Sequence, residues 1–199
     1  MMILEKETNR QKSDKEIVSL LQDGDDYALN EIMSRYKQKL FAFIYAYTKN
    51  EEVSEEILQE VFIKLYFKAK TYNPKYSFST LIHQVAINLC HDHYKKQKLS
   101  NLLSLDRSFK EDKKINYHEV LADPNSNVEN LVQLRQDISI LDKEINNLPH
   151  KLKTALILFV LEGYSQEKCA EILKITPKTI ETRIYRARKI LAKKIATNF

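Results

Sequence analysis

The sequence predicts an all-α protein made of two small helical domains joined by a linker. Apolar residues recur at helical intervals through most of the 199 residues, and no stretch shows the alternation of a β-strand. The periodicity fades between residues 99 and 135, where both charges mix around the open sequence DPNSN. After this segment we expect a helix from Val132 to Ile145, a break at Leu148 and Pro149, and a second helix that ends at Gly163. A short helix, a turn and a basic helix then follow, in the order of a helix-turn-helix. We therefore expect domains at residues 1–98 and 136–199, with the linker at 99–135.

The composition excludes several classes of function. With two glycines, the chain has no Gly-rich phosphate loop and no dinucleotide fingerprint. Cys90 and Cys169 allow one disulfide, but so few cysteines are typical of a reduced intracellular protein. No apolar run is long enough for a signal peptide or a membrane span. We expect a cytoplasmic protein, not inserted in a membrane, with no catalytic constellation and no cofactor; its net charge of +5 favours a polyanionic partner.

The first domain should be a bundle around one buried helix. Ser13 is placed to cap a first helix, which ends at Gly24. A second helix begins near Tyr27 and continues through LFAFIYAYT, residues 40–48, which is apolar nearly all round. A helix that is apolar on every side is expected at the centre of a domain.

The third helix, from Glu51, should carry a ridge of acidic and polar residues opposite its apolar stripe. Helical spacing places one set on a single face, which we call the acidic ridge: Glu52, Glu55, Glu56 and Gln59, with Glu60 beside it. A solvated surface is the ordinary interpretation of such a face. Because the chain is otherwise basic, a docking face for a positively charged partner is the alternative.

The charge reverses from residue 64 to 98, where seven lysines accompany one acid, Asp92. Pro74 breaks the helical pattern within TYNPKYSFST, residues 71–80, and Ser79 or Thr80 should cap the next helix. Aromatic rings among lysines suit single-stranded nucleic acid, since bases stack on rings while lysines hold phosphates. Alternatively, the rings of this loop anchor it to the core.

A metal site near the end of that helix is not expected. The candidate ligands are His83, Cys90, His91, Asp92 and His93. Cys90 and His93 can share a helical face, but His91 points elsewhere and no second ligand pair follows.

The C-terminal helix-turn-helix, residues 163–194, has the clearest local signals. Ser165 can cap its first helix, and Thr176 followed by Pro177 marks the start of the second. On one side the second helix carries the apolar set Ile180, Ile184, Ala187, Leu191 and Ile195. Between residues 177 and 194 it has one acid, Glu181, and seven basic residues, a composition suited to the major groove of DNA.

Together these segments resemble a sigma factor of the sigma-70 family, of the extracytoplasmic-function (ECF) type. EEILQEVFIKLY and FSTLIHQVAINLCHDHYKK resemble its region 2, and LPHKLKTALILFVLEGYSQEKCAEILKITPKTIETRIYRARKIL resembles its region 4. The resemblance implies a protein that binds core RNA polymerase, recognises the −10 and −35 promoter elements and starts strand melting. It also implies an anti-sigma factor as a probable partner, although no residue identifies one.

The resemblance assigns three sets of residues. It implies that the acidic ridge, Glu52, Glu55, Glu56, Gln59 and Glu60, docks on the clamp coiled coil of the largest polymerase subunit. The −10 element would be met and melted by Tyr72, Lys75, Tyr76, Phe78, Ser79, Asn88, Asp92, Lys95 and Lys96. The −35 element would be met by Lys178, Thr179, Glu181, Thr182, Arg183, Tyr185, Arg186, Arg188 and Lys189.

Two residues depart from the family pattern. Leu81 stands where the family usually has Trp, which puts an aromatic role there in doubt. Glu181 stands where a basic residue is common, and its carboxylate can accept a hydrogen bond from cytosine N4. A stand-alone helix-turn-helix regulator that binds duplex DNA is the alternative function, but it leaves the acidic ridge unexplained. A metal-dependent nuclease using His91, Asp92 and His93 lacks a ligand set.

Overall fold

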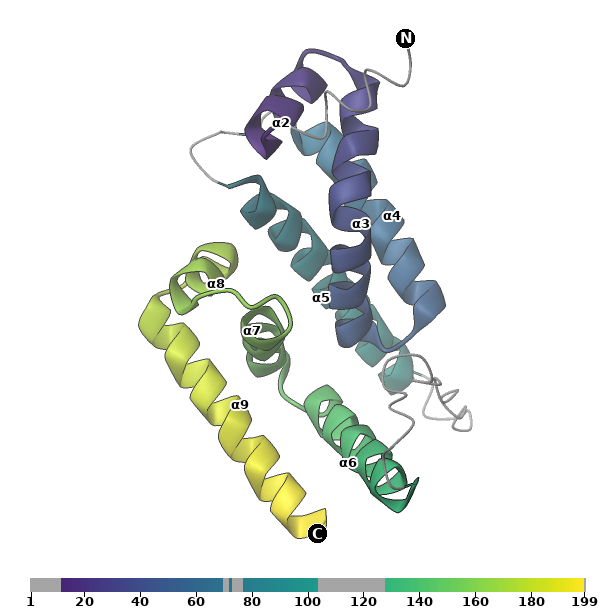
Figure 1. Ribbon diagram of the computed structural model, residues 1–199, viewed down its shortest axis with the longest axis vertical. Coiled ribbons are helices and arrows are strands. Elements are labelled where there is room, and N and C mark those ends of the chain that lie inside the picture. The colour runs from purple at the N-terminus through teal and green to yellow at the C-terminus, as the bar shows by residue number, and fades with distance from the viewer. Residues whose placement is uncertain (1–11, 70–71, 73–76, 104–127, 199) are drawn as a thin grey trace.

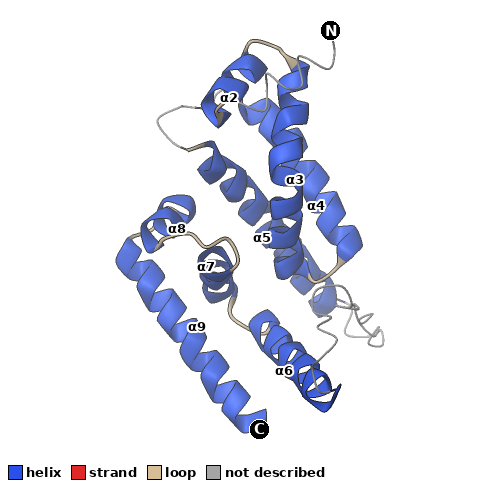
Figure 2. Cartoon of the chain, in the orientation of Figure 1, coloured by secondary structure: helices blue, strands red, loops and turns tan. Residues whose placement is uncertain are grey.

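The computed structural model describes residues 12–69, 72, 77–103 and 128–198, and every regular element in these ranges is an α-helix (Figure 2). The helices are α2 (Asp14–Gln22), α3 (Asp26–Thr48), α4 (Glu51–Ala69), α5 (Phe78–Leu103), α6 (Val128–Asn146), α7 (His150–Val160), α8 (Gln166–Leu173) and α9 (Pro177–Asn198). The predicted all-α class is confirmed. Lys75 and Tyr76 of the predicted −10 set lie outside the described residues, as do residues 104–127 of the predicted linker.

The N-terminal half, α2 to α5, is a bundle in which α3 contacts the other three helices. The Ser13 hydroxyl and the Glu16 carboxylate form a reciprocal capping box at the start of α2. Gly24 ends the turn after α2 with a φ of +92°, a conformation that glycine adopts without steric cost. In α3, Leu40, Phe43 and Ile44 are fully buried, as the apolar stretch at 40–48 predicted.

The C-terminal half, α6 to α9, contains the predicted helix-turn-helix, formed by α8 and α9. The Ser165 hydroxyl accepts a hydrogen bond from the Lys168 amide at 3.2 Å and so caps α8. The Thr176 hydroxyl accepts one from the Thr179 amide, also at 3.2 Å, and α9 begins at Pro177. Both caps that the sequence indicated are therefore present.

The two halves pack against each other. Figure 1 shows α7 and α8 between α5 on one side and α9 on the other, with α9 on the outer side of the molecule. The contacts between the halves join α5 to α8 and α3 to α7. Buried residues of both halves belong to one apolar cluster, in which Phe43 and Ile82 from the first half are grouped with Leu158 and Cys169 from the second.

The expected cap of α5 is corrected. Ser79 and Thr80 were expected to cap α5, but the helix already begins at Phe78, so both residues lie in its first turn. Their side chains contact the C-terminal half instead. In addition, α5 runs on to Leu103 and α6 begins at Val128, so helical structure enters the predicted linker from both ends. Cys90 and Cys169 are both buried free thiols, which closes the disulfide alternative.

Candidate nucleic-acid interface

Helix α9 has one buried face and one exposed face, divided as its sequence indicated. Ile180 and Ala187 are fully buried, and Ile184 is 4% exposed. Tyr185 is 64% exposed, and Lys178, Glu181, Arg186, Arg188 and Lys189 are also exposed. Thr179, Thr182 and Arg183 are partly exposed at the edge of this face. All nine candidate −35 residues are thus at or beside the solvent face of one helix.

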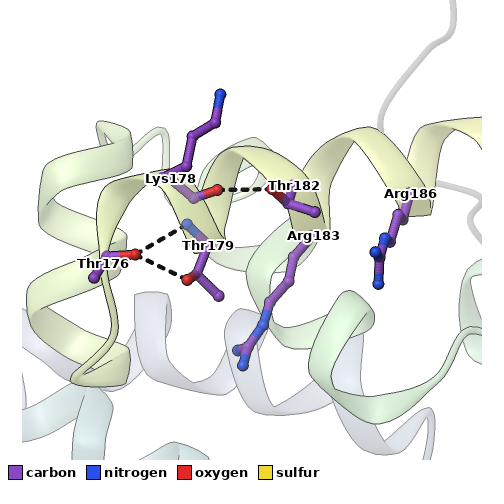
Figure 3. Close-up of a pocket in the computed structure, with 6 residues that line it drawn as sticks. All are labelled: Thr176, Lys178, Thr179, Thr182, Arg183 and Arg186. Atoms are coloured by element: carbon purple, nitrogen blue, oxygen red, sulfur yellow. Dashed lines mark hydrogen bonds between the residues drawn. The ribbon is translucent and has the colours of Figure 1, made fainter.

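The first turns of α9 form an open depression of about 260 Å³, shown in Figure 3. Its threonine hydroxyls are hydrogen-bonded within the helix: the Thr176 and Thr179 hydroxyls share a bond of 2.8 Å, and the Thr182 hydroxyl donates one of 2.8 Å to the Lys178 carbonyl oxygen. The side chains of Arg183 and Arg186 extend to the same side of the helix (Figure 3). Two guanidinium groups on the same side of one helix suit phosphate oxygens and guanine edges.

Glu181 is paired within its own helix. Its carboxylate accepts a hydrogen bond from the Lys178 ammonium at 2.8 Å, and both side chains are well exposed. Since an exposed ion pair of this kind is worth about 0–1 kcal/mol, a DNA base can replace Lys178 as the partner of Glu181.

The acidic ridge of α4 is exposed along its whole length. Glu52, Glu55, Glu56 and Gln59 are exposed, and Glu60 forms an ion pair with Lys64 of the same helix, at 2.8 Å. This leaves at least four groups of the ridge free to meet a basic surface.

A groove of about 830 Å³ lies beside the ridge, between α3 and α4. Glu55 and Gln59 are on its rim, and its apolar lining includes Met33 and Phe62. Ile63 and Phe67 are 58% and 64% exposed at its edge. Ile63 and Phe67 are not among the residues predicted from the sequence, because the prediction used the buried stripe and the acidic ridge of α4. Their position outside that stripe is the signal that could have identified them.

The candidate −10 residues divide into exposed and buried groups. Asn88, Asp92, Lys95 and Lys96 are exposed along α5 at intervals that keep them near one face. Phe78, in contrast, is 2% exposed and meets the Tyr36 and Tyr72 rings edge-on. Phe78 is therefore a core anchor, the alternative left open for the aromatic loop, and its ring has no free face for a base. Tyr72 is half-buried beside it.

Ser79, the remaining described candidate, faces the C-terminal half. Its hydroxyl shares a hydrogen bond of 3.0 Å with the Tyr164 hydroxyl, which lies between α7 and α8. The neighbouring Leu81, in the position of the family's usual Trp, is partly buried against the core.

The histidines that suggested a metal site serve other contacts. His83 is 2% exposed, with Nδ1 at 2.8 Å from the Ser79 carbonyl oxygen and Nε2 at 3.3 Å from a Glu162 carboxylate oxygen. The His91 ring lies against that of His150, with centroids 4.1 Å apart. Within the described ranges, no cluster of three or more His, Cys, Asp or Glu side chains could hold a metal ion.

Two titratable groups between the halves, His150 and Lys153, have lowered pKa values. Burial first, and then electrostatic repulsion from His91 and Lys153, lower the pKa of His150 to about 4. Burial and the nearby Lys49 lower the pKa of Lys153 to about 8. Lys153 donates hydrogen bonds to the Tyr47 carbonyl oxygen at 2.7 Å and to the Asn146 side-chain oxygen at 2.6 Å. These groups lie where α7 meets α3.

The fold and these surfaces define a two-part DNA-binding protein with a helix-turn-helix in its second half. Comparison with protein families matches residues 32–99 to the model "Sigma-70 region 2" and residues 138–191 to "Sigma-70, region 4". The chain belongs to the sigma-70 family of RNA polymerase sigma factors, and its relatives are of the ECF type. Its function is therefore to bind RNA polymerase and direct transcription initiation at promoters, and the stand-alone regulator is excluded.

Two relatives align with more than nine tenths of the chain. It is 30% identical to the ECF RNA polymerase sigma-E factor of Haemophilus influenzae, over 93% of this chain and 96% of that protein. It is also 30% identical to the ECF RNA polymerase sigma factor SigW of Bacillus subtilis, over 91% and 96% of the two chains.

Solved structures share the fold. The structure of CnrH in complex with the cytosolic domain of CnrY matches with a TM-score of 0.67 and 16% identity, over 94% of this chain and 100% of that one. The sigma factor RpoE of Bartonella quintana, in complex with the anti-sigma factor NepR, matches with a TM-score of 0.66 and 19% identity, over 85% and 98%. None of the helices that the structure describes combines the length and apolar character needed to span a bilayer.

Proposed function

We propose that this sigma factor uses three separate surfaces: α4 for the polymerase core, α5 for the −10 element and α9 for the −35 element. The observation that carries the proposal is that each of these helices exposes most of its described candidate residues to solvent and buries its opposite face. The proposed domains are residues 1–98 and 136–199, with the linker at 99–135. Since the template and the core enzyme are in the cytoplasm, we place the protein there, as a non-enzymatic subunit.

The −35 element is read by α9. Arg186 and Tyr185 face solvent at the centre of the helix, where they can reach base edges in the major groove. Arg188 and Lys189 follow on the exposed face and can hold phosphates. Arg186→Ala should weaken binding of −35 duplex DNA by about 1–3 kcal/mol.

The −10 element is met along α5, by a narrower set than the sequence implied. Asn88 and Asp92 offer polar groups to bases, while Lys95 and Lys96 hold phosphates. The first turn of α5, with Ser79 and the adjoining Tyr72, is the segment proposed to capture an unstacked base. Phe78 is left out of this surface because its ring lies in the core.

The polymerase core docks on the acidic ridge, and the adjoining groove extends that surface. Carboxylates of the ridge attract a basic partner, and apolar residues at the groove edge, Ile63 and Phe67, provide area that is buried on docking. The same groove suits an amphipathic helix of an anti-sigma factor. The complexes of CnrH with CnrY and of RpoE with NepR support such a partner for this chain.

Charge reversal tests the docking surface. Glu56→Lys combined with Glu60→Lys should reduce affinity for core polymerase at least tenfold at low ionic strength, because like charges then face each other. Affinity for duplex DNA should stay unchanged, since α9 is on the other side of the molecule. Fluorescence titration of labelled protein with purified core measures the affinity for core polymerase, and fluorescence anisotropy of a labelled duplex measures the affinity for DNA. A control outside the groove is Lys15→Glu combined with Lys39→Glu, on exposed positions of α2 and α3, which should leave core affinity near the wild-type value. Normal core affinity of the ridge variant would remove α4 from the interface.

A further inference from the structure

His150, the first residue of α7, lies where basic side chains of three helices meet. The ring of His91, on α5, approaches the His150 ring with centroids 4.1 Å apart, and the Tyr94 ring lies at 6.0 Å. His91, Tyr94 and Lys95 fall at i, i+3 and i+4 of α5, so they share the face that is turned to α7. Arg183 of α9 is close enough to His150 to lower its pKa, as is Lys95. Side chains of α5, α7 and α9 therefore converge on one point, with α7 between the other two helices (Figure 1).

The basic groups at this point have no acidic partners. We call them the cation cluster: His91 and Lys95 of α5, His150 of α7 and Arg183 of α9. In the ranges that the structure describes, none of these four side chains forms an ion pair with a carboxylate. Lys153 of α7 adds an ammonium group that is 7% exposed and held by hydrogen bonds within the interface. Like charges that gather in this way destabilise the folded chain unless an anion offsets them.

The start of α7 adds hydrogen-bond donors to the cluster. Pro149 is the N-cap of α7 and no side chain caps the helix, while amides in the first turn of a helix have no partner within it. In addition, the Nε2 atom of His150 is buried and has no hydrogen-bond partner among the described residues. Amide, imidazole, ammonium and guanidinium N–H groups all donate well to phosphate oxygens. The charges and the unpaired donors thus indicate the same kind of ligand, a phosphate-bearing anion.

We propose that the cation cluster binds the polyphosphate group of a small ligand, either inorganic triphosphate or a nucleoside triphosphate. The convergence of the donors on one point favours a compact ligand over a nucleic-acid strand, because a strand is held by a groove that follows its backbone. The Tyr94 ring, 46% exposed beside the cluster, offers a face on which a nucleobase can stack. The polyphosphate is common to both ligands, and the base distinguishes them.

A ligand in this site engages two residues of the proposed DNA surfaces. Lys95 belongs to the set proposed for the −10 element, and Arg183 belongs to the set proposed for the −35 element. A bound polyphosphate should therefore compete with promoter DNA for both side chains. This consequence rests on the proposed function, whereas binding of the ligand itself does not.

Isothermal titration calorimetry of the full chain with inorganic triphosphate, at constant ionic strength and without DNA, tests the site. We expect saturable binding of one ligand per chain, and the ligand should raise the unfolding temperature because it binds the folded state. His91→Gln combined with Lys95→Gln should weaken binding by about tenfold or more, since charge-assisted hydrogen bonds are lost. His93→Gln combined with Lys96→Gln changes the same residue types on the same helix and should leave the affinity near the wild-type value.

Arg183→Gln tests the contribution of α9. It should weaken triphosphate binding by about tenfold, because the ligand contacts all three helices. Lys189→Gln, at another basic residue of α9, is the matched control and should have little effect. Lys95→Gln alone serves if the double variant misfolds, since Lys95 is exposed, and circular dichroism without ligand checks the fold. The absence of saturable binding, or equal affinities of the wild type and Arg183→Gln, overturns the proposal.

A nucleoside triphosphate, titrated in the same way, identifies the source of the polyphosphate. Tighter binding than that of inorganic triphosphate, with the difference lost in Tyr94→Leu, assigns the site to a nucleotide, and equal affinities assign it to inorganic polyphosphate. A third titration uses a single-stranded oligonucleotide. If His91→Gln combined with Lys95→Gln weakens binding of the oligonucleotide but not of triphosphate, the cluster belongs to the DNA surface and the proposal is overturned.

Competition between triphosphate and a labelled −35 duplex, followed by fluorescence anisotropy, tests the proposed function separately. We expect triphosphate to displace the duplex from the wild type more effectively than sodium chloride of the same ionic strength. Triphosphate that binds in the calorimeter without displacing the duplex would remove Arg183 from the −35 contact, and the polyphosphate site would stand.

Discussion

At the scale of single residues, Glu181 is the most informative position of the recognition helix. It is the one acid among the basic residues of its helix between 177 and 194, and its carboxylate is bound to Lys178 at the exposed surface. The family resemblance placed Glu181 among the residues that meet the −35 element, and its side chain is 53% exposed. The ion pair with Lys178 could not be predicted, because several rotamers of two long exposed side chains have similar free energies.

We predict that Glu181→Gln changes base preference at one −35 position. A carboxylate only accepts hydrogen bonds and suits cytosine N4, whereas the glutamine amide also donates and suits adenine. The preference should shift by about 1–3 kcal/mol at that position and at no other. This shift in base preference is measured by competition binding, in which the polymerase–sigma complex binds duplexes that differ at one −35 position at a time. Lys178→Ala, which removes only the intrahelical partner, should leave the preference in place; identical preferences for the wild type and Glu181→Gln would show that Glu181 does not read a base.

At the scale of elements, helix faces and caps were the most predictable features. Apolar spacing identified the buried face of α9, and the hydroxyl groups of Ser165 and Thr176 marked two helix starts. Such signals are local, because a cap involves residues three apart and a face repeats every three or four. The start of α5 was mispredicted at Ser79 or Thr80, since their hydroxyl groups bond to distant residues of region 4 rather than to their own helix.

The division of α9 into faces predicts the stability of region 4. Ile184→Ala should lower the free energy of unfolding by about 2–5 kcal/mol, because it removes a buried aliphatic side chain and leaves a cavity. Tyr185→Ala, on the adjacent and 64% exposed residue, should change it by less than about 0.5 kcal/mol. Urea denaturation followed by circular dichroism measures both. Equal effects of the two substitutions would mean that the faces are assigned incorrectly.

At the scale of the whole molecule, the contacts between the halves are the least predictable feature. Lys153 is 7% exposed, and its ammonium donates a hydrogen bond to the carbonyl oxygen of Tyr47. Tyr47 is 106 positions away in the sequence, at the C-terminal end of α3. A lysine in sequence is normally assigned to the surface. Its burial depends on how the two helical halves meet, and neither helical periodicity nor charge patterning contains that information.

The contact between α7 and region 2 should weaken in acid. His150 has a pKa of about 4 here, below its ordinary value of 6.5, so the open or unfolded chain binds the proton more tightly. The stabilisation is complete above pH 6.5 and is lost as the pH falls through that value towards 4. Lys153, with a pKa of about 8, is already protonated throughout this window. The charged or titratable groups around His150 are His91, Tyr94 and Lys95 of α5, Tyr47 of α3, Lys153 of α7 and Arg183 of α9.

Fluorophores can be placed on Ser34→Cys of α3 and Ala192→Cys of α9, both exposed positions. Energy transfer between them, measured from pH 7.5 to 4.5, should fall as the pH drops below about 6.5. His150→Gln, which does not titrate, should flatten the decrease. A wild-type curve that is level over this range, or a variant curve with the same slope, would show that His150 does not control the contact.

The central claim is that the two halves act together as the promoter-reading subunit of an RNA polymerase. Run-off transcription with purified core polymerase, on fragments of the genome that encodes the protein, tests it most directly. We predict discrete transcripts with wild-type protein, with starts that share −10 and −35 elements. Arg186→Ala and the Glu56→Lys, Glu60→Lys variant should each reduce these transcripts, the first through the −35 contact and the second through core binding. Duplex DNA binding by the wild type without any specific transcript would contradict the claim.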